Sequence, residues 1–265
     1  MRVAYLLPET GISATARIAA AQADALIAAG HQVRIVTTAL PMTWRSSRAE
    51  WVYVDQFRQF VADDGERVIN AGSDIVRHNA IVDDEFFRER IAREHEPLRV
   101  LLCGGSHVQN KGLSEGYGAA AHARWFHQTF DLVRVSPWAP SREEPLDSVQ
   151  EFHIALTASE MTRLMHSCDV LIAPNRREDP LSLTTLEALA SGLACVATAT
   201  PAHLAAAADA ALFAPPDNAV ELGEKLIEIV EDGALRERLR ARGREVVAKF
   251  RAASVVKRLE QTLSN

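Results

Sequence analysis

The chain has 265 residues, which suits one large or two small domains, and 48% of them are hydrophobic, enough for buried cores. Its formal net charge of −6 gives no overall basic field that would favour nucleic acid. Cys103, Cys168 and Cys195 lack zinc-site spacing and stand in or beside apolar runs, which favours a reducing compartment. The N-terminal apolar run is too short for a signal peptide and no run reaches transmembrane length, so we expect a cytoplasmic protein.

The first part of the chain predicts a strand, a helix and a second strand. Arg2–Leu7 is a short apolar run, Ala14–Ala29 is alanine-rich and helical, and Gln32–Thr37 returns as a strand. This order is typical of a parallel, doubly wound sheet. A third strand is expected at Trp51–Val54. The loop after the first strand holds Gly11, but no G-x-G-x-x-G pattern surrounds it, so it is not a dinucleotide fingerprint.

The loop between the second and third strands raises the question of a membrane contact. Trp44 stands beside Arg45 in a polar segment. Such a pair fits contact with a membrane surface or an acceptor, and it is more often ordinary packing. Peripheral membrane contact therefore stays open at this point.

A second strand-loop-helix start occurs at Leu98–Cys103. Gly104 and Gly105 follow this strand, and Lys111 comes six residues after them. A lysine after a glycine-rich turn is suited to binding phosphate, although solvated loop lysines are also common. Further strands are expected at Asp131–Val135, Phe152–Leu156 and Ala210–Ala214, and further helices at Leu113–Phe126, Thr157–His166, Asn218–Glu231 and Ala234–Leu263.

The most informative stretch reads as strand, loop, helix and strand. Asp169–Pro174 is a short apolar run, and Asn175–Leu181 is a charged loop. Ser182 can cap a helix that ends at Gly192. Ala194–Ala199 is then a buried strand. A strand that feeds a loop and a helix N-terminus makes an anion site, because the free N–H groups and the helix dipole favour phosphate.

Two carboxylates flank the start of this helix. Glu187, about one turn in, could accept hydrogen bonds from a ribose diol, and Asp179 lies at the mouth of the same pocket. Asp179 and Glu187, with seven residues between them and ALASGLACVAT after them, resemble the signature of family-four retaining GT-B glycosyltransferases (group 1). That signature usually has Glu in the place of Asp179, and glycines in the places of Pro180 and Ser182.

The resemblance implies roles for residues along the chain. Asp179 would face the donor sugar as the catalytic residue, and Glu187 would bind the ribose. Lys111 would neutralise the donor diphosphate; the family's usual arginine is replaced by Ser106 or His107. Further donor contacts would come from Gly11 and Gly105 in the glycine-rich loops, from Ser182, Leu183 and Thr184 at the helix start, and from His153 and Ile154 near the base.

The resemblance also implies an α/β fold of GT-B type with two Rossmann-like domains. Residues 1–96 would form an N-terminal domain and linker, and residues 97–265 the nucleotide-sugar-binding domain, with a final helix crossing back. Only about three strands are expected before the linker, whereas a doubly wound half often has roughly six. The N-terminal domain is therefore expected to be shortened.

The resulting hypothesis is a glycosyltransferase that moves a sugar from a nucleotide-sugar donor to an unidentified acceptor with retention. No D-x-D triplet, Walker loop or H-E-x-x-H occurs, so we expect neither a metal nor a cofactor. One alternative is a degenerate homologue or partner subunit that binds nucleotide or sugar without turnover. A weaker one is a sugar-nucleotide epimerase of similar two-domain shape.

Overall fold

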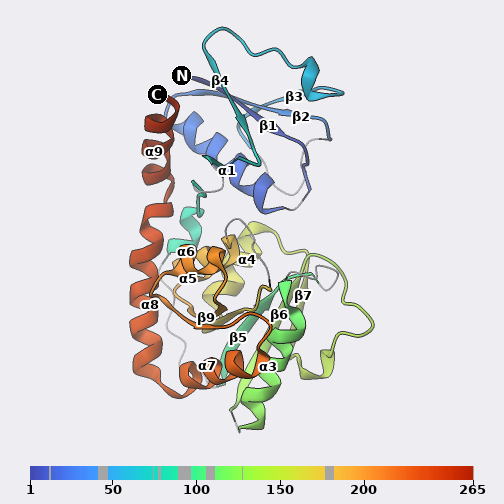
Figure 1. The fold of residues 1–265 in the computed structure, drawn as a ribbon, viewed down its shortest axis with the longest axis vertical. Coiled ribbons are helices and arrows are strands. Elements are labelled where there is room, and N and C mark those ends of the chain that lie inside the picture. Colours follow the sequence, from blue (N-terminus) through green and yellow to red (C-terminus); the bar gives the residue numbers. More distant parts are fainter. Residues whose placement is uncertain are drawn as a thin grey trace. The chain divides into compact units, whose positions relative to one another are not determined.

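The computed structural model describes the chain apart from Ile12, residues 41–46, Asp74, residues 77–78, 89–96 and 106–110, His127, residues 177–181 and Asn265. The described part divides into two compact units (Figure 1). The first comprises Met1–Asp83 and Lys249–Asn265, and the second comprises Asp84–Ala248. The second unit thus begins earlier in the chain than residue 97, the predicted start, and the C-terminal segment belongs to the first unit.

The first unit contains a parallel sheet of strand order β3-β2-β1-β4. Its elements are β1 (Arg2–Leu7), α1 (Ala14–Ala28), β2 (Gln32–Thr37), β3 (Glu50–Tyr53) and β4 (Glu66–Asn70). The Ser13 hydroxyl caps α1 by accepting from the Ala16 N–H at 3.1 Å. The sequence does not predict β4, because this edge strand buries only Ile69 and so has no apolar run. The unit therefore has one strand more than expected.

The C-terminal helix α9 (Ala252–Ser264) packs against α1 within the first unit. The His31 ring and the Glu260 carboxylate meet at 2.8 Å, and the Arg258 guanidinium donates to the Asn79 side chain at 3.2 Å. The sequence predicts a helical segment at Ala234–Leu263 with a break near Gly243 and Arg251. In the structure the break is a 3-10 turn, η5 (Ala248–Phe250), which lies directly before Arg251 and follows α8 (Gly233–Val247). Gly243 does not break α8, because its bare Cα gives room for the Leu189 side chain.

The second unit is built on a parallel sheet of order β10-β9-β8-β5-β6-β7. Its strands are β5 (Leu98–Cys103), β6 (Phe130–Ser136), β7 (Glu151–Ile154), β8 (Val170–Ala173), β9 (Ala194–Thr198) and β10 (Ala211–Ala214). β6 and β7 follow β5 on one side, whereas β8, β9 and β10 extend on the other. The strand order therefore reverses between β5 and β8, which is the position where doubly wound sheets bind ligands.

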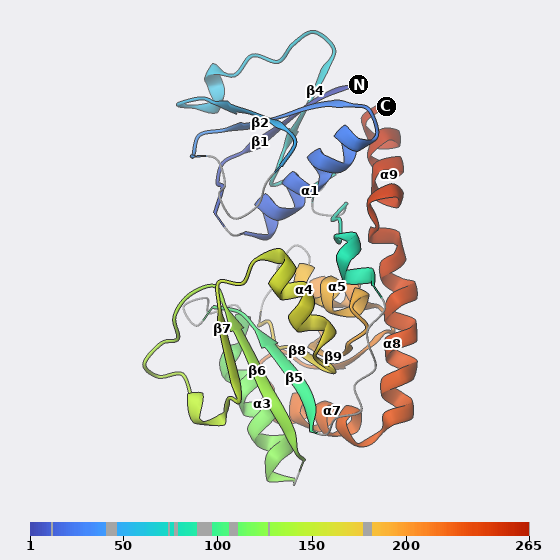
Figure 2. The same cartoon turned by 180° about the vertical axis from the view of Figure 1, so that it is seen from behind.

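Helices cover both faces of this second sheet (Figures 1 and 2). One layer consists of α3 (Leu113–Trp125) and α7 (Ala219–Glu231), and the other includes α4 (Ala158–His166), α5 (Leu183–Ala190), α6 (Pro201–Ala207) and α8. Val100, Leu102 and Ile172 belong to the apolar core that the sheet shares with α3 and α7. Two parallel α/β sheets, each with its own strand-helix start, confirm the predicted fold class.

A buried ion pair joins β6 to the loop that follows it. The Arg134 side chain has no exposed surface, and its Nε donates to Glu144 Oε1 at 2.8 Å. The same carboxylate oxygen accepts from the Tyr117 hydroxyl of α3 at 2.7 Å. A charge in this position is tolerated only with its partner, since desolvation of a lone guanidinium costs several kcal/mol.

We expect Glu144→Gln to lower the free energy of unfolding by about 3–5 kcal/mol, because it leaves the Arg134 charge buried without a counter-ion. Glu228→Gln is the matched control, because Glu228 pairs with Lys225 on the exposed surface of α7. That control should change the free energy by less than about 0.5 kcal/mol. Urea unfolding measures both variants, and equal changes would contradict the assignment.

Candidate functional site

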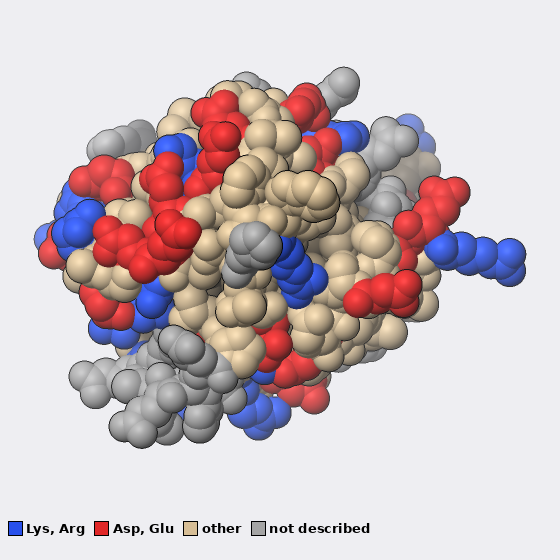
Figure 3. All heavy atoms as spheres, turned by 90° about the horizontal axis from the view of Figure 1, so that it is seen from below, with Lys and Arg blue, Asp and Glu red and all other residues tan. Residues whose placement is uncertain are grey.

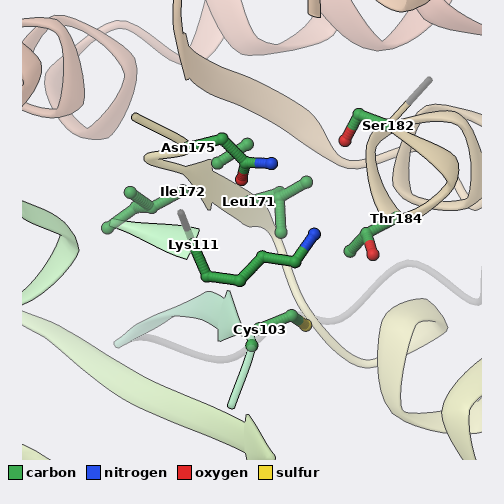
Figure 4. Close-up of a pocket in the computed structure, with 9 residues that line it drawn as sticks. Cys103, Lys111, Leu171, Ile172, Asn175, Ser182 and Thr184 are labelled. Atoms are coloured by element: carbon green, nitrogen blue, oxygen red, sulfur yellow. The ribbon is translucent and has the colours of Figure 1, made fainter. Parts of the chain in front are cut away.

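A small hollow of about 50 Å³ lies at the carboxyl ends of β5 and β8 (Figure 4). This is the point where the strand order of the second sheet reverses. The lining consists of Cys103, Gly104, Lys111, Leu171, Ile172, Ala173, Asn175, Ser182 and Thr184. Two segments that continue from these residues, 106–110 and 177–181, lie outside the described residues. The location is the usual one for a ligand of a doubly wound sheet.

One side of the hollow depends on the close approach of α3 to the end of β8. Gly112, the N-cap of α3, has a φ of 58°, and a Cβ atom on it would overlap the Pro174 carbonyl oxygen. Arg176 strengthens the junction, because its Nε donates to Glu115 Oε1 in the first turn of α3 at 2.8 Å. Burial raises the pKa of Glu115, but hydrogen bonds, above all from Arg176, outweigh it and hold this pKa below its usual range. The Lys111 side chain therefore enters the hollow beside the first residues after β8.

Two helices begin at this hollow without a side-chain cap. Gly112 has no side chain to cap α3, and Ser182 makes no capping bond to α5; its hydroxyl instead lies 2.8 Å from that of Thr185. By contrast, α1, α4, α6, α7 and α8 each have a side-chain cap. Neither N-cap residue therefore occupies an N–H group of its helix, and a helix start without a cap favours an anion. In α3 the Glu115 carboxylate accepts from its own backbone N–H in the first turn.

The electrostatics of the hollow are set by burial and by charges of both signs. Burial raises the pKa of the Cys103 thiol, the charge of Glu187 acts in the same direction, and that of Lys111 opposes it. The thiol is therefore neutral at physiological pH and is not an activated nucleophile. The charges of Lys111 and Glu187 therefore have opposite effects on the same thiol, which lines the hollow.

The predicted residues at the start of α5 have different environments. Ser182 and Thr184 line the hollow, whereas Leu183 is buried in the apolar packing. Glu187 is only 2% exposed. It follows Thr184 by three positions, so the two share one side of the helix.

The other predicted residues lie farther from the hollow. A Cβ on Gly105 would collide with the Trp138 ring, so this glycine makes room for the indole. His153 and Ile154 end β7, at the same carboxyl edge of the sheet, with Ile154 half exposed. Gly11 belongs to the first unit, in the exposed loop after β1.

Several predictions fall outside the described residues. Asp179 and Pro180 of the signature do, as do Trp44 and Arg45 of the proposed membrane contact, and Ser106 and His107 of the glycine-rich loop. Their roles stay predictions.

The structure adds residues that the sequence did not indicate. Asn175 and Cys103 line the hollow. Behind Asn175, the buried Thr198 hydroxyl donates to the Asn175 carbonyl, and the buried His203 ring is hydrogen-bonded to the Thr198 carbonyl. The available signal was position alone: Cys103, Asn175 and Thr198 each stand at or just after the end of a predicted strand. Because parallel strands end at one edge, such residues converge there.

Other kinds of site find little support in the described part of the chain. Those residues contain no cluster of three or more His, Cys, Asp and Glu arranged to take a metal ion. None of their helices combines the length and the apolar character that crossing a bilayer requires. On the face in Figure 3, basic and acidic side chains are interspersed, and they form no continuous basic surface for a phosphate backbone.

Comparison with known proteins bears on the family. Residues 141–246, which include β8 and the start of α5 at the hollow, match the family model described as "Glycosyl transferases group 1". The predicted resemblance to group 1 glycosyltransferases is confirmed. No curated protein matches the sequence significantly.

Solved structures bear on the fold. WaaG, a glycosyltransferase involved in lipopolysaccharide biosynthesis, superposes with a TM-score of 0.75 at 16% identity, covering 99% of this chain and 100% of that one. A glycosyltransferase from Rickettsia africae gives 0.69 at 13% identity, over 99% and 97%. Sucrose-phosphate synthase from Thermosynechococcus elongatus gives 0.62 at 16%, over 100% and 98%. These likenesses confirm the predicted GT-B-like fold.

Gly112→Ala should destabilise the second unit for two reasons. An alanine is strained at this left-handed backbone position, and its methyl group would also overlap the Pro174 carbonyl. Gly30→Ala is the matched control: its φ is 88°, but open space surrounds its Cβ position. We expect about 1–2 kcal/mol for the control and a clearly larger loss for Gly112→Ala. Equal losses in chemical unfolding would show that α3 does not need this close approach.

Proposed function

We propose that this protein transfers a sugar from a nucleotide-sugar donor to an acceptor with retention, and that no metal ion takes part. The observation that carries this proposal is the hollow between β5 and β8, which combines the Lys111 ammonium with two helix starts that have no side-chain cap. The group 1 family match and the GT-B-like fold support transferase activity.

The donor diphosphate would bind where these groups converge. An ammonium and the N–H groups of helix N-termini are positive partners for phosphate oxygens. They can also stabilise the charge that develops on the diphosphate as the bond to the sugar breaks. Lys111 and the start of α5 would therefore do work that a metal ion does in other transferases.

The ribose would bind along α5, beyond the diphosphate. Thr184 lines the hollow, and Glu187 is the next polar residue on the same side of the helix. A carboxylate can accept hydrogen bonds from both hydroxyls of a ribose diol. The position of Glu187, almost fully buried and close enough to influence Cys103, supports this role.

Asp179 would provide the carboxylate at the sugar. The segment that contains it runs from Asn175 to Ser182, and both of these residues line the hollow. Asp179 is thus at most four residues from a lining residue on either side. In the transition state of glycosyl transfer, positive charge develops at the sugar, and a nearby carboxylate stabilises it.

Lys111→Met should weaken the binding of nucleoside diphosphates by about tenfold or more, because it removes the ammonium but keeps most of the side-chain volume. Isothermal titration calorimetry with UDP, GDP and ADP measures the effect. Lys225→Met, on the exposed side of α7, is the matched control and should bind like the wild type. A Lys111→Met variant with unchanged affinity for every diphosphate that the wild type binds would remove Lys111 from the site.

Asp179→Asn should lower turnover far more than it lowers diphosphate affinity, because the carboxylate charge matters most when the sugar becomes cationic. Both quantities are measured on the same variant, in the presence of EDTA, with a donor that the wild type accepts. Equal turnover of variant and wild type would refute the catalytic role. A wild type that binds diphosphates but turns over no donor would favour the alternative, a nucleotide-binding homologue without turnover.

A further inference from the structure

A chain of buried hydrogen bonds connects three elements behind the hollow. The Thr198 hydroxyl at the end of β9 donates to the Asn175 carbonyl oxygen just beyond β8, at 2.6 Å. His203 Nδ1, in α6, lies 2.9 Å from the carbonyl oxygen of Thr198. All three residues are buried, with 7% exposure or less. The chain therefore runs from α6 through β9 to a residue that lines the hollow.

The first bond determines where the backbone goes after β8. Ala173, the last residue of β8, pairs in register with Ala197 of β9, so the ladder ends before Asn175. The Asn175 carbonyl lies outside the sheet, and a buried carbonyl needs a hydrogen-bond partner. The Thr198 hydroxyl is such a partner, and it holds Asn175 in line with the strand.

The bond between His203 and Thr198 holds Thr198 in place, and Thr198 in turn holds Asn175. Because the Thr198 carbonyl only accepts, His203 must carry its proton on Nδ1 and donate. His203 is itself placed by the start of α6, which Thr200 caps. A rigid arrangement of this kind keeps a neighbouring side chain in one position.

The side chain held in this way faces the phosphate-binding groups. Figure 4 shows the amide end of Asn175 and the ammonium of Lys111 extending into the same hollow, opposite Ser182 and Thr184. An amide NH₂ donates hydrogen bonds, and a site for an anion gains affinity from each well-placed donor.

We propose that Asn175 binds the diphosphate of the donor through its amide, and that Thr198 and His203 are positioning residues for it. This inference rests on the proposed function of the hollow. Asn175, which follows β8, would then be a diphosphate-binding residue close to the family signature. Its positioning residues extend the site to β9 and α6.

The test uses inorganic pyrophosphate, which has no base, ribose or sugar. Its affinity is measured by calorimetry for the wild type, Lys111→Met and Asn175→Asp. The Asn175→Asp change keeps the shape of the side chain, but it replaces the amide NH₂, a hydrogen-bond donor to the anion, with a negatively charged oxygen. We expect its affinity to fall about tenfold or more, the size of one hydrogen bond to a charged group. A fall for Lys111→Met alone would overturn the role of Asn175 and leave the proposed function intact. No pyrophosphate or nucleoside diphosphate binding by the wild type would instead overturn the proposed function.

The positioning roles are tested by pairs of variants. Thr198→Val removes the hydroxyl but keeps the shape, so affinity should fall between about three- and tenfold, and Thr198→Ser should recover most of it. His203→Asn keeps a donor near the position of Nδ1, whereas His203→Gln places it near Nε2. We expect the Asn variant to bind pyrophosphate more tightly than the Gln variant. Equal affinities within either pair would overturn the positioning role, because a loss of packing alone would not follow the hydrogen-bonding atom.

Discussion

The meeting of α3 with the end of β8 at Gly112 is the constraint on which the site depends. A parallel sheet whose order reverses leaves a gap between the connections at the reversal, and the first turn of α3 would normally be kept out of it by side chains. Here the positive φ of Gly112 and its lack of a Cβ let the helix start touch the Pro174 carbonyl. The approach brings Lys111, the α3 N-terminus, Ser182 and Thr184 around one hollow.

The chemistry of the hollow follows from this packing. Positive partners come from the backbone of two helices and from one lysine, while the nearby thiol is kept neutral by burial. Such a site favours an anion without needing a basic surface, which fits a chain with a net charge of −6. Glu187, buried in α5 one turn beyond Thr184, is the carboxylate that the proposed function assigns to the ribose.

The sequence predicted the parts of this arrangement that have a local cause. The start of α5 at Leu183 follows from the apolar spacing and from Ser182, and the strands β1, β2 and β5 follow from apolar runs. The resemblance to the family marked Lys111, Ser182 and Thr184 as binding residues, and all three line the hollow. β4 was missed because an edge strand with one buried residue has no pattern.

Other features depend on contacts between residues distant in the chain, which no local pattern contains. The bond from Thr198 to Asn175 spans 23 residues, and the Arg134 pair is visible only once the loop after β6 folds back. The contact of Gly243 with Leu189 is also distant in the chain, and it lets α8 continue through Gly243 despite the weak helix propensity of glycine.

The most direct test of this account is a crystal structure of the protein with a bound nucleoside diphosphate. The account predicts phosphate oxygens within hydrogen-bonding distance of Lys111 Nζ and of the backbone N–H groups in the first turn of α5, with the ribose toward Glu187. A diphosphate bound away from the carboxyl ends of β5 and β8 would contradict it.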